Sequence, residues 1–469
     1  MYFNNHVHDE YSNAALGFPD VVNKVEDVIQ KAYDLGLSGI AITNHECVSS
    51  HIKALQYYEK MEKDRPFKIA LGNEIYLMDE SEDEENRTEK RTVYPYYHFI
   101  LTALDTLGHK QIRELSTRAW KRAYFSRGLM RTPTYYSDIE EVIGQEKGHV
   151  VASTACLGSF LDKMILQWKN GDNTAKLAIH SFITWCIDTF GKDNFFLEIQ
   201  PCYEDNVEQM TVNDAMKELS KAYKLGIIPT TDAHYLTKDM AFVHKTYLNS
   251  KESEREVDKF YATTYLMDEE ELSSFLKLQF STKEIDEMYK NTLLIWDRIT
   301  EYDLQRNPII PQIPEEKLPQ FKIRHLFKEW YSKYPNFAFY SSNERTQHEQ
   351  YFFYQIEKGF EKKVCNNVKP KNIEQYIAGL NEEFEQFRLI SEALGTSLPC
   401  YFSSMSQIID IIWNTGSLVM PGRGSAGACL SCYLLDITQI DPVPFGDYMP
   451  FWRFMNIQRG VEPVSYTHL

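Results

Sequence analysis

The 469-residue sequence has no long apolar run, no secretion signal and no excess of positive charge. Without about 18 consecutive apolar residues, a typical membrane-spanning helix is excluded. The N-terminus MYFNNHVHDEY lacks the basic and apolar segments of a signal peptide. The eight cysteines are scattered, which favours reduced thiols over a disulfide framework. We therefore expect a cytoplasmic protein with no membrane partner.

The charge balance is acidic, with 67 Asp and Glu against 50 Lys and Arg. This argues against a protein that coats nucleic acid through its overall charge, although it allows a local basic groove. The acidic segment 78–90 is expected to be a solvated loop. The segment 118–131, RAWKRAYFSRGLMR, holds five cations and no acid, so it is either an exposed helix face or a phosphate-binding segment.

Helix and strand patterns alternate through the first half of the chain. Apolar residues at 25, 28, 29 and 32 have helical spacing, Gly36 ends that helix, and the apolar segment 38–43 reads as a buried strand. Further strands are predicted at 67–72, 97–104, 149–154, 194–200 and 225–231. Such repeated units favour a parallel α/β barrel or a doubly wound sheet, with chemistry at the carboxyl ends of the strands.

Ligand-type side chains stand at the predicted strand ends. His6 and His8 are two residues apart, so in a strand both imidazoles face the same side. Further acid, imidazole and thiol groups follow the later strands: His45, Glu74, Cys156, Asp232 and His234. A core histidine or a helix cap would explain any one of them, but not their recurrence. Mixed ligands of this kind suit two or three zinc, manganese or iron ions, which predicts a metal-dependent phosphoesterase site.

These motifs carry a family resemblance. HVHDEYSN, GIAITNHE, LGNEIYL, YYHFILTA, STACLG and TTDAHYL resemble the successive motifs of the polymerase and histidinol phosphatase (PHP) domain that opens bacterial DNA polymerase III alpha subunits. The resemblance implies a seven-stranded α/β barrel that holds up to three Zn²⁺ or Mn²⁺ ions and acts as a 3′–5′ proofreading exonuclease, or as a structural platform. The implied ligands are His6, His8, Asp20, His45, Glu74, His98, Cys156, Asp232 and His234.

Two positions depart from the family pattern. The stretch YSNAALGFPD has about two extra residues before Asp20, so Asp9 or Glu10 is an alternative third ligand. Asn44 stands where the family usually has aspartate, next to the ligand His45.

A second motif, PGRGSAGACLSCYLLD, begins at Pro421. Its small residues allow backbone amides to face an anion, and the N-terminus of the predicted helix after them would favour phosphate; close helix packing is the alternative. The motif resembles PGRGSAAGS in the palm of the same family, and the similarity continues to the segment NIQR. The resemblance implies that Gly424 and Ser425 contact the triphosphate of a nucleotide, that Arg423 supports the loop, and that Arg453 and Arg459 lie near the phosphates.

The paired catalytic aspartates of the polymerase family are missing. They would follow NIQR as a D-x-D motif holding Mg²⁺, whereas the sequence leaves the family pattern after Pro463. We therefore expect a fragment, with a non-native tail at 464–469 and no polymerase catalytic residues. The expected domains are a PHP domain at 1–283, a proline-rich linker at 284–320 and a partial palm of α+β class at 321–463.

The full-length protein is expected to be a DNA-directed DNA polymerase of bacterial replication. Its partners would be a DNA primer-template, deoxynucleotides, a sliding clamp and other replisome subunits. The alternatives are a freestanding PHP phosphoesterase or exonuclease and a non-catalytic, metal-stabilised scaffold.

Overall fold

The structure is a computed structural model that describes residues 1–17, 19–89, 93–126, 129–250, 259–305, 311–369 and 372–458. It divides into two compact units, residues 1–305 and residues 306–469, and each is described by itself. The non-native tail expected at 464–469 lies outside the described residues. No helix in the described ranges is both long and apolar enough to span a bilayer.

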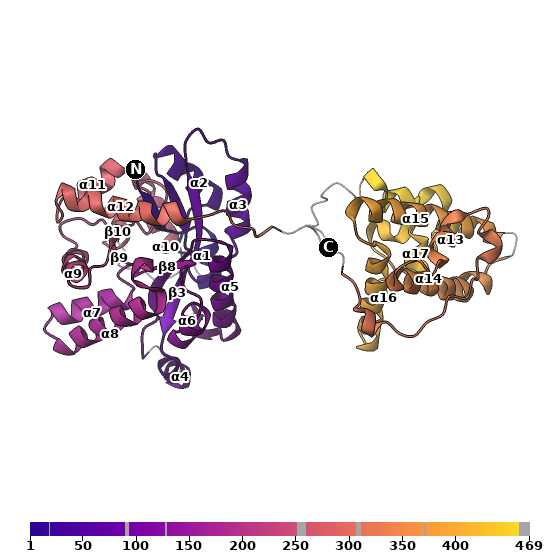
Figure 1. The fold of residues 1–469 in the computed structure, drawn as a ribbon, viewed down its shortest axis with the longest axis horizontal. Helices are drawn as coiled ribbons and strands as arrows, with labels where there is room; N and C mark the ends of the chain where they lie inside the picture. Colours follow the sequence, from indigo (N-terminus) through magenta and orange to yellow (C-terminus); the bar gives the residue numbers. More distant parts are fainter. Residues whose placement is uncertain are drawn as a thin grey trace. The chain divides into compact units, whose positions relative to one another are not determined.

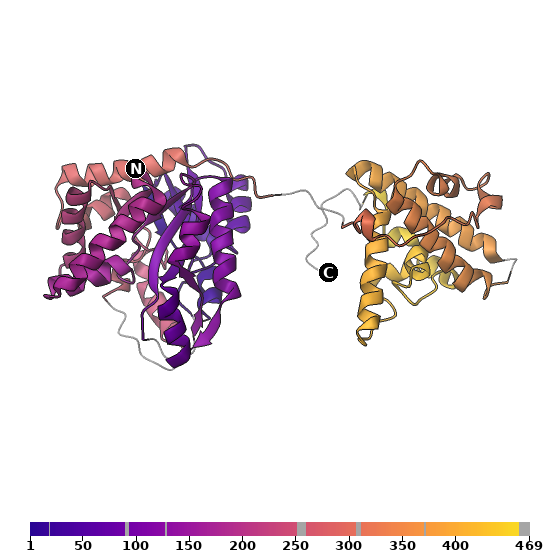
Figure 2. The same cartoon turned by 60° about the horizontal axis from the view of Figure 1, so that its bottom comes forward.

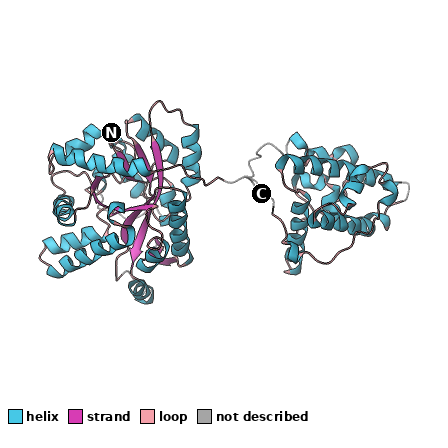
Figure 3. Ribbon diagram, in the orientation of Figure 1, coloured by secondary structure: helices cyan, strands magenta, loops and turns pink. Residues whose placement is uncertain are grey.

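The first unit is built on a sheet of seven strands in spatial order, with one further strand paired at its side (Figures 1 and 3). The seven are β1 (Phe3–Val7), β2 (Gly39–Ile42), β3 (Lys68–Met78), β4 (Tyr97–Ala103), β8 (Val150–Ser153), β9 (Phe195–Ile199) and β10 (Ile227–Pro229). Val7 also pairs with Ala233, beyond β10, and His8 N–H donates to the Ala233 carbonyl at 3.1 Å. The sheet therefore returns to its first strand, which confirms the expected barrel-like sheet.

The expectation of a fully parallel sheet was wrong, because one strand runs in the opposite direction. Every neighbouring pair on the path is parallel except those of β4, which runs antiparallel to both β3 and β8. The connection between β3 and β4 does not cross the sheet, so β4 returns from the end at which β3 finishes. Strand β7 (Pro133–Tyr135) pairs with β3, and β5 (Tyr124–Ser126) forms a separate hairpin with β6 (Leu129–Arg131).

Helices surround the strands of the first unit (Figures 1 and 2). They are α1 (Tyr11–Leu16), α2 (Val25–Asp34), α3 (His51–Lys60), α4 (Glu80–Glu89), α5 (Thr106–Lys121), α6 (Tyr136–Val142), α7 (Phe160–Lys169), α8 (Asn173–Phe190), α9 (Val207–Tyr223), α10 (Ala241–Leu248), α11 (Glu269–Leu276) and α12 (Thr282–Arg298). Helix α4 corrects the expectation of a solvated loop at 78–90. It forms because Asp83 and Asn86 face inward: Asp83 accepts hydrogen bonds from Tyr135 and Arg87, both at 2.8 Å.

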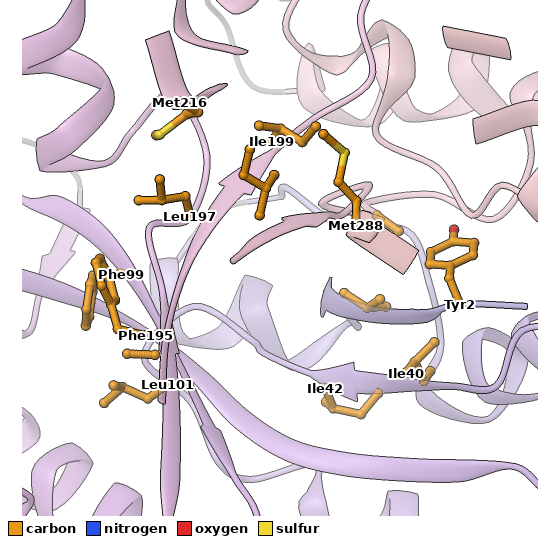
Figure 4. Close-up of a cluster of buried hydrophobic side chains, with 14 of the residues drawn as sticks. Tyr2, Ile40, Ile42, Phe99, Leu101, Phe195, Leu197, Ile199, Met216 and Met288 are labelled. Carbon is orange, nitrogen blue, oxygen red and sulfur yellow. The ribbon is translucent and has the colours of Figure 1, made fainter. Parts of the chain in front are cut away.

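The apolar core of the first unit gathers side chains from the strands and from the helices packed on them. Figure 4 shows part of it, including Ile42 from β2, Leu197 from β9 and Met216 from α9. Helix α12 belongs to this unit, since Ile295 is buried with residues of six strands and the Thr292 hydroxyl accepts from Phe3 N–H at 3.1 Å. Residues 284–305, expected in the linker, therefore pack with the barrel.

Within its described residues, 311–369 and 372–458, the second unit consists of helices and loops, without a strand. Its helices are α13 (Pro335–Ser341), α14 (Gln347–Phe360), α15 (Ile373–Leu394), α16 (Pro399–Asn414) and α17 (Leu430–Leu434). The strands expected of an α+β palm do not occur in these ranges, because the apolar positions follow helical spacing around a core rich in phenylalanine. Gly359 in α14 allows close packing, since a Cβ there would lie 2.1 Å from the Leu434 carbonyl oxygen.

Candidate functional site

The nine predicted ligands meet at one end of the barrel. His6 lies in β1 and His8 just beyond it, while His45, Cys156, Asp232 and His234 follow the carboxyl ends of parallel strands. Glu74 lies within β3, where its backbone pairs with that of His45. His98 stands at the start of β4, and the antiparallel direction of that strand brings its first residues to the same end. One mixed sheet thus collects ligands from strands of both directions.

Short distances connect the ligand atoms. His6 Nε2 and His8 Nε2 lie 3.1 Å apart, and Asp232 Oδ1 is 3.0 Å from the first and 3.1 Å from the second. Glu74 contacts His45 Nδ1 at 2.5 Å and His98 Nδ1 at 2.8 Å. The Cys156 sulfur lies 3.6 Å from His98 Nδ1. The cluster contains three groups whose ligand atoms lie within 4.8 Å of one another: His8 with His45 and His234, His6 with His8 and Asp232, and His45 with Glu74 and His98.

Of the three candidates for the third ligand position, Asp20 reaches the cluster: its Oδ2 lies 3.1 Å from His45 Nε2 and 3.2 Å from His234 Nε2. The two alternatives have other partners. Asp9 accepts from the Asn44 side chain at 2.8 Å, and Glu10 accepts from Val25 N–H at the start of α2. Proximity therefore favours Asp20 over both alternatives.

Asn44 has a defined role next to the cluster. Its amide nitrogen donates to Asp9, and its carbonyl oxygen accepts from the Ser12 hydroxyl at 2.8 Å. The Ser12 oxygen in turn lies 3.2 Å from His8 Nδ1. Asparagine can donate to one neighbour and accept from the other, which a carboxylate in its place could not do.

The residues present fit divalent metal ions. His45 Nδ1, Glu74 Oε2 and Asp232 Oδ1 are buried and lack hydrogen-bond partners within the described residues, although His45 Nδ1 lies 2.5 Å from Glu74 Oε2 and Asp232 Oδ1 lies 3.1 Å from His8 Nε2. Close, buried lone pairs without hydrogen-bond geometry are costly unless a cation accepts them. Imidazole, carboxylate and thiolate together form a common ligand set for zinc-like ions. The cluster is thus a site of metal-binding type.

The protonation of the cluster suits metal binding in part, because Asp232 and His8 have lowered pKa values whereas the pKa values of His6 and Cys156 are raised and these two groups must lose protons to bind a metal. Burial acts to raise the pKa of the Asp232 carboxyl, but the facing imidazoles of His6, His234 and His8 together outweigh burial and hold this pKa well below its usual value. Burial, together with the charges of His45 and His234, lowers the pKa of His8 to about 3, so its imidazole is neutral at physiological pH. Burial raises the pKa of the Cys156 thiol, and the nearby carboxylates add to this effect.

Glu198 supports the cluster and was not predicted. Its carboxylate accepts from His6 Nδ1–H at 2.6 Å, from the Ser153 hydroxyl at 2.8 Å and from the Thr230 hydroxyl at 2.5 Å. A carboxylate on the second ring nitrogen of a metal-binding histidine fixes the orientation of the imidazole and raises its basicity. The available signal was a single acid inside the apolar strand FFLEI, at a position where burial without a partner would be costly.

A cavity of about 320 Å³ opens onto the ligands. Its lining combines ligand side chains, among them Asp20, His98 and Asp232, with aromatic residues and Arg131. The Tyr261 hydroxyl donates to Asp20 Oδ1 at 3.0 Å and so holds this carboxylate on the side of the cavity. The volume falls within the range of small-molecule sites.

The basic segment 118–131 divides into two functions. Arg118 and Arg122 face acids at the end of α5: Arg118 contacts Glu141 at 2.7 Å, and Arg122 pairs with Asp138. Arg131, at the end of β6, lines the cavity instead. Within residues 118–126 and 129–131, the segment is therefore neither one exposed helix face nor one basic patch.

The predicted nucleotide loop borders a separate cavity in the second unit. Gly424, Ser425 and Arg453 line this cavity of about 330 Å³, with Gly424 at a φ of 59° that favours glycine. Arg423 is exposed and, within the described residues, has no side-chain hydrogen bond or ion pair with which to support the loop. The prediction for Arg459 falls outside the described residues.

The helix after this loop does not present its N-terminus to a ligand, contrary to expectation. Helix α17 has only five residues, and its Leu430 and Ser431 N–H groups donate to the buried carboxylate of Glu383 at 2.5 and 2.8 Å. The dipole is thus matched by an acid of the protein itself. Burial raises the pKa of Glu383 to about 7, against the opposing effect of these hydrogen bonds. Cys429 and Cys432, a C-x-x-C pair at the same turn, are buried, and no ligand group in the described residues includes them.

Comparison with known proteins finds one domain family for each part of the chain. The PHP domain matches residues 4–202, and the domain described as bacterial DNA polymerase III alpha NTPase domain matches residues 350–463. The chain is 37% identical over 476 residues to the Bacillus subtilis protein named Probable DNA polymerase YorL and, equally, to the DNA-directed DNA polymerase of Bacillus phage SPbeta. It is 27% identical over 494 residues to the DNA polymerase III subunit alpha of Thermus aquaticus.

These alignments cover 98% of the chain but only 36–37% of each relative, so the chain spans about a third of the length of the curated relatives that it matches. The two domains occur in the order that the motifs predicted. The chain is similar over nearly its whole length to DNA polymerase III alpha subunits, and it carries a match to the PHP domain followed by a match to the bacterial DNA polymerase III alpha NTPase domain.

Proposed function

We propose that this chain is the N-terminal part of a replicative DNA polymerase, and that its barrel hydrolyses phosphodiester bonds as a 3′–5′ exonuclease. The observation that carries the hydrolytic proposal is the convergence of all nine ligand-type side chains on one buried site beside an open cavity. Multi-metal sites with this ligand chemistry are a recurring device for phosphoester hydrolysis.

The metals proposed for this site are Zn²⁺ or Mn²⁺, up to three ions. The holding residues would be His6, His8, Asp20, His45, Glu74, His98, Cys156, Asp232 and His234. Bound divalent ions supply charge stabilisation and the activation of water at such sites. The protein supplies ionised carboxylates, a neutral His8, and Glu198 to hold His6 in one orientation.

The polymerase proposal rests on the second unit and on the relatives. Gly424, Ser425 and Arg453 share one cavity, which supports their proposed contact with the triphosphate of a deoxynucleotide. Because Glu383 occupies the N-terminus of α17, the loop amides and arginine would carry that binding. The Mg²⁺-binding carboxylates, the primer-template and the clamp and replisome contacts are proposed for the full-length protein.

The hydrolytic proposal is tested with the full chain loaded with Mn²⁺ or Zn²⁺. We expect it to shorten single-stranded DNA from the 3′ end, and we expect D232N to abolish cleavage. The exposed variant Glu208→Gln serves as the matched control and keeps activity. If the wild type binds metal at the nine residues but cleaves no DNA, the barrel is a structural platform and the exonuclease proposal is wrong.

The nucleotide site is tested by calorimetric titration of a deoxynucleoside triphosphate into the full chain. We expect R453A to weaken binding by about tenfold or more, because it removes a charge-assisted contact to phosphate. K328A removes an exposed cation of the same unit and should leave the affinity unchanged. Equal affinity in wild type and R453A would exclude this cavity as the triphosphate site.

A further inference from the structure

Arg131 is the one lysine or arginine among the described residues that line the cavity over the metal-type cluster. The ligand set contributes imidazoles, carboxylates and a thiol, all of which would be engaged by metal ions. A substrate phosphate that enters the cavity would therefore meet a single protein cation outside the cluster.

No carboxylate of the described residues forms an ion pair with Arg131. Within the described part of the chain, its Nε atom is buried without a hydrogen-bond partner. Arg118 and Arg122, which precede it in the same basic segment, both face carboxylates. A buried guanidinium N–H without a partner is costly, and a bound anion would remove that cost.

Aromatic packing holds the side chain in place without using its charge. The guanidinium carbon lies 4.8 Å from the centre of the Tyr96 ring. The hydroxyls of Tyr96 and Tyr124 are hydrogen-bonded to each other and lie 3.3 and 3.2 Å from Oδ1 of the buried Asp83, so one hydroxyl donates to the carboxylate and the other to its tyrosine neighbour. Because Tyr124 pairs with Arg131 across the β5–β6 hairpin, this network anchors the hairpin at the level of the arginine. A stacked guanidinium is thereby oriented before a ligand binds.

We propose that Arg131 is the phosphate-binding residue of the barrel site, holding a phosphate of the substrate at the mouth of the metal cluster through guanidinium hydrogen bonds. The inference deepens the proposed exonuclease function and rests on it for the identity of the substrate. Its chemistry requires only a phosphate oxyanion. Binding of that anion is measurable without turnover.

The test uses the full chain loaded with Mn²⁺ and titrated calorimetrically with inorganic phosphate and with thymidine 5′-monophosphate. We expect R131A to weaken both affinities by about 10- to 100-fold, which is the range of one or two charge-assisted hydrogen bonds. R131K retains the charge but not the planar fork, and should fall between R131A and wild type. The control is Arg113→Ala, which removes an exposed arginine from α5 and should bind phosphate as the wild type does.

Metal content, measured by elemental analysis on the same samples, should be equal in all four proteins. Wild-type phosphate affinity in R131A would overturn the inference, as would a failure of the wild type to bind phosphate. Loss of metal in R131A would also overturn it, because Arg131 would then support the ligands rather than the substrate.

Cleavage assays separate this inference from the proposed function. Phosphate binding that depends on Arg131, without cleavage of single-stranded DNA by any variant, would refute the exonuclease and leave the inference standing. Where DNA is cleaved, R131A should raise KM with a smaller effect on kcat. Cleavage by R131A with unchanged KM would refute the inference alone.

Discussion

Replacement of Glu198 should weaken metal binding without removing a ligand. In E198Q the amide oxygen can still accept from His6 and Thr230, and the amide nitrogen can donate to the Ser153 hydroxyl, so shape and hydrogen-bond count are kept. What is lost is the negative charge opposite His6 Nδ1. A hydrogen bond to a charged group contributes about 1.5–3 kcal/mol, against about 0.5–1.5 kcal/mol for a neutral one.

The difference, about 1–1.5 kcal/mol, corresponds to roughly a tenfold loss of metal affinity for E198Q. In E198A the orienting contact itself disappears, and we expect about a hundredfold loss, at the upper end for supporting residues around metal sites. The assay is competition for Zn²⁺ between the full chain and a chelating indicator at one fixed pH. Glu208→Gln, an exposed change in α9, is the control. Affinity in E198Q within about twofold of the wild type would refute the argument that Glu198 acts through His6.

Three further outcomes are expected. Because the pKa of Glu383 is raised to about 7, the folded state binds one more proton than the unfolded state between about pH 4.5 and 7. The free energy of opening measured by amide exchange in α15 and α17 should therefore fall by up to about 3 kcal/mol as the pH rises over that interval. E383Q should remove this pH dependence and Glu382→Gln should keep it, whereas an equal pH dependence in all three proteins would contradict the reasoning. D20N should lose bound metal in elemental analysis while E10Q retains it, whereas the reverse result would make Glu10 the ligand. F384A should destabilise the second unit by about 3–5 kcal/mol in exchange measurements, since Phe384 is buried among other aromatic rings, and a loss below about 1 kcal/mol would show that the core collapses around the cavity.

The strands and seven of the nine clustered side chains were predictable from local signals, whereas Asp20 and His98 were implied only by the family resemblance. Each predicted strand of the first half is an apolar segment of the right length, and the two-residue period of a strand explains why His6 and His8 act together. Spacing also predicted that ligands at strand ends would meet, since parallel strands end at one edge of a barrel.

The errors in strand direction, in helix α4 and in the roles of two buried acids concern properties that no local pattern contains. The direction of β4 depends on how the chain from Met78 to Tyr97 returns, and the acidic helix α4 forms because Asp83 meets tyrosines from other elements. The roles of Glu198 and Glu383 depend on donors that are distant in the sequence. An acid within an apolar strand or a buried helix face indicates that a partner exists, but not which one.

The closure of the barrel has a consequence for how the protein is made. β1 is completed by residues beyond β10, and the Asn4 side chain donates to Thr231, 227 residues later. Asp232 emerges from the ribosome on the order of tens of seconds after His6 and His8. Two of the three ligand groups combine His6 or His8 with Asp232 or His234. Metal capture at these groups would therefore mark the moment at which the nascent barrel closes, and a bound ion would oppose reopening of a long loop whose closure is entropically costly.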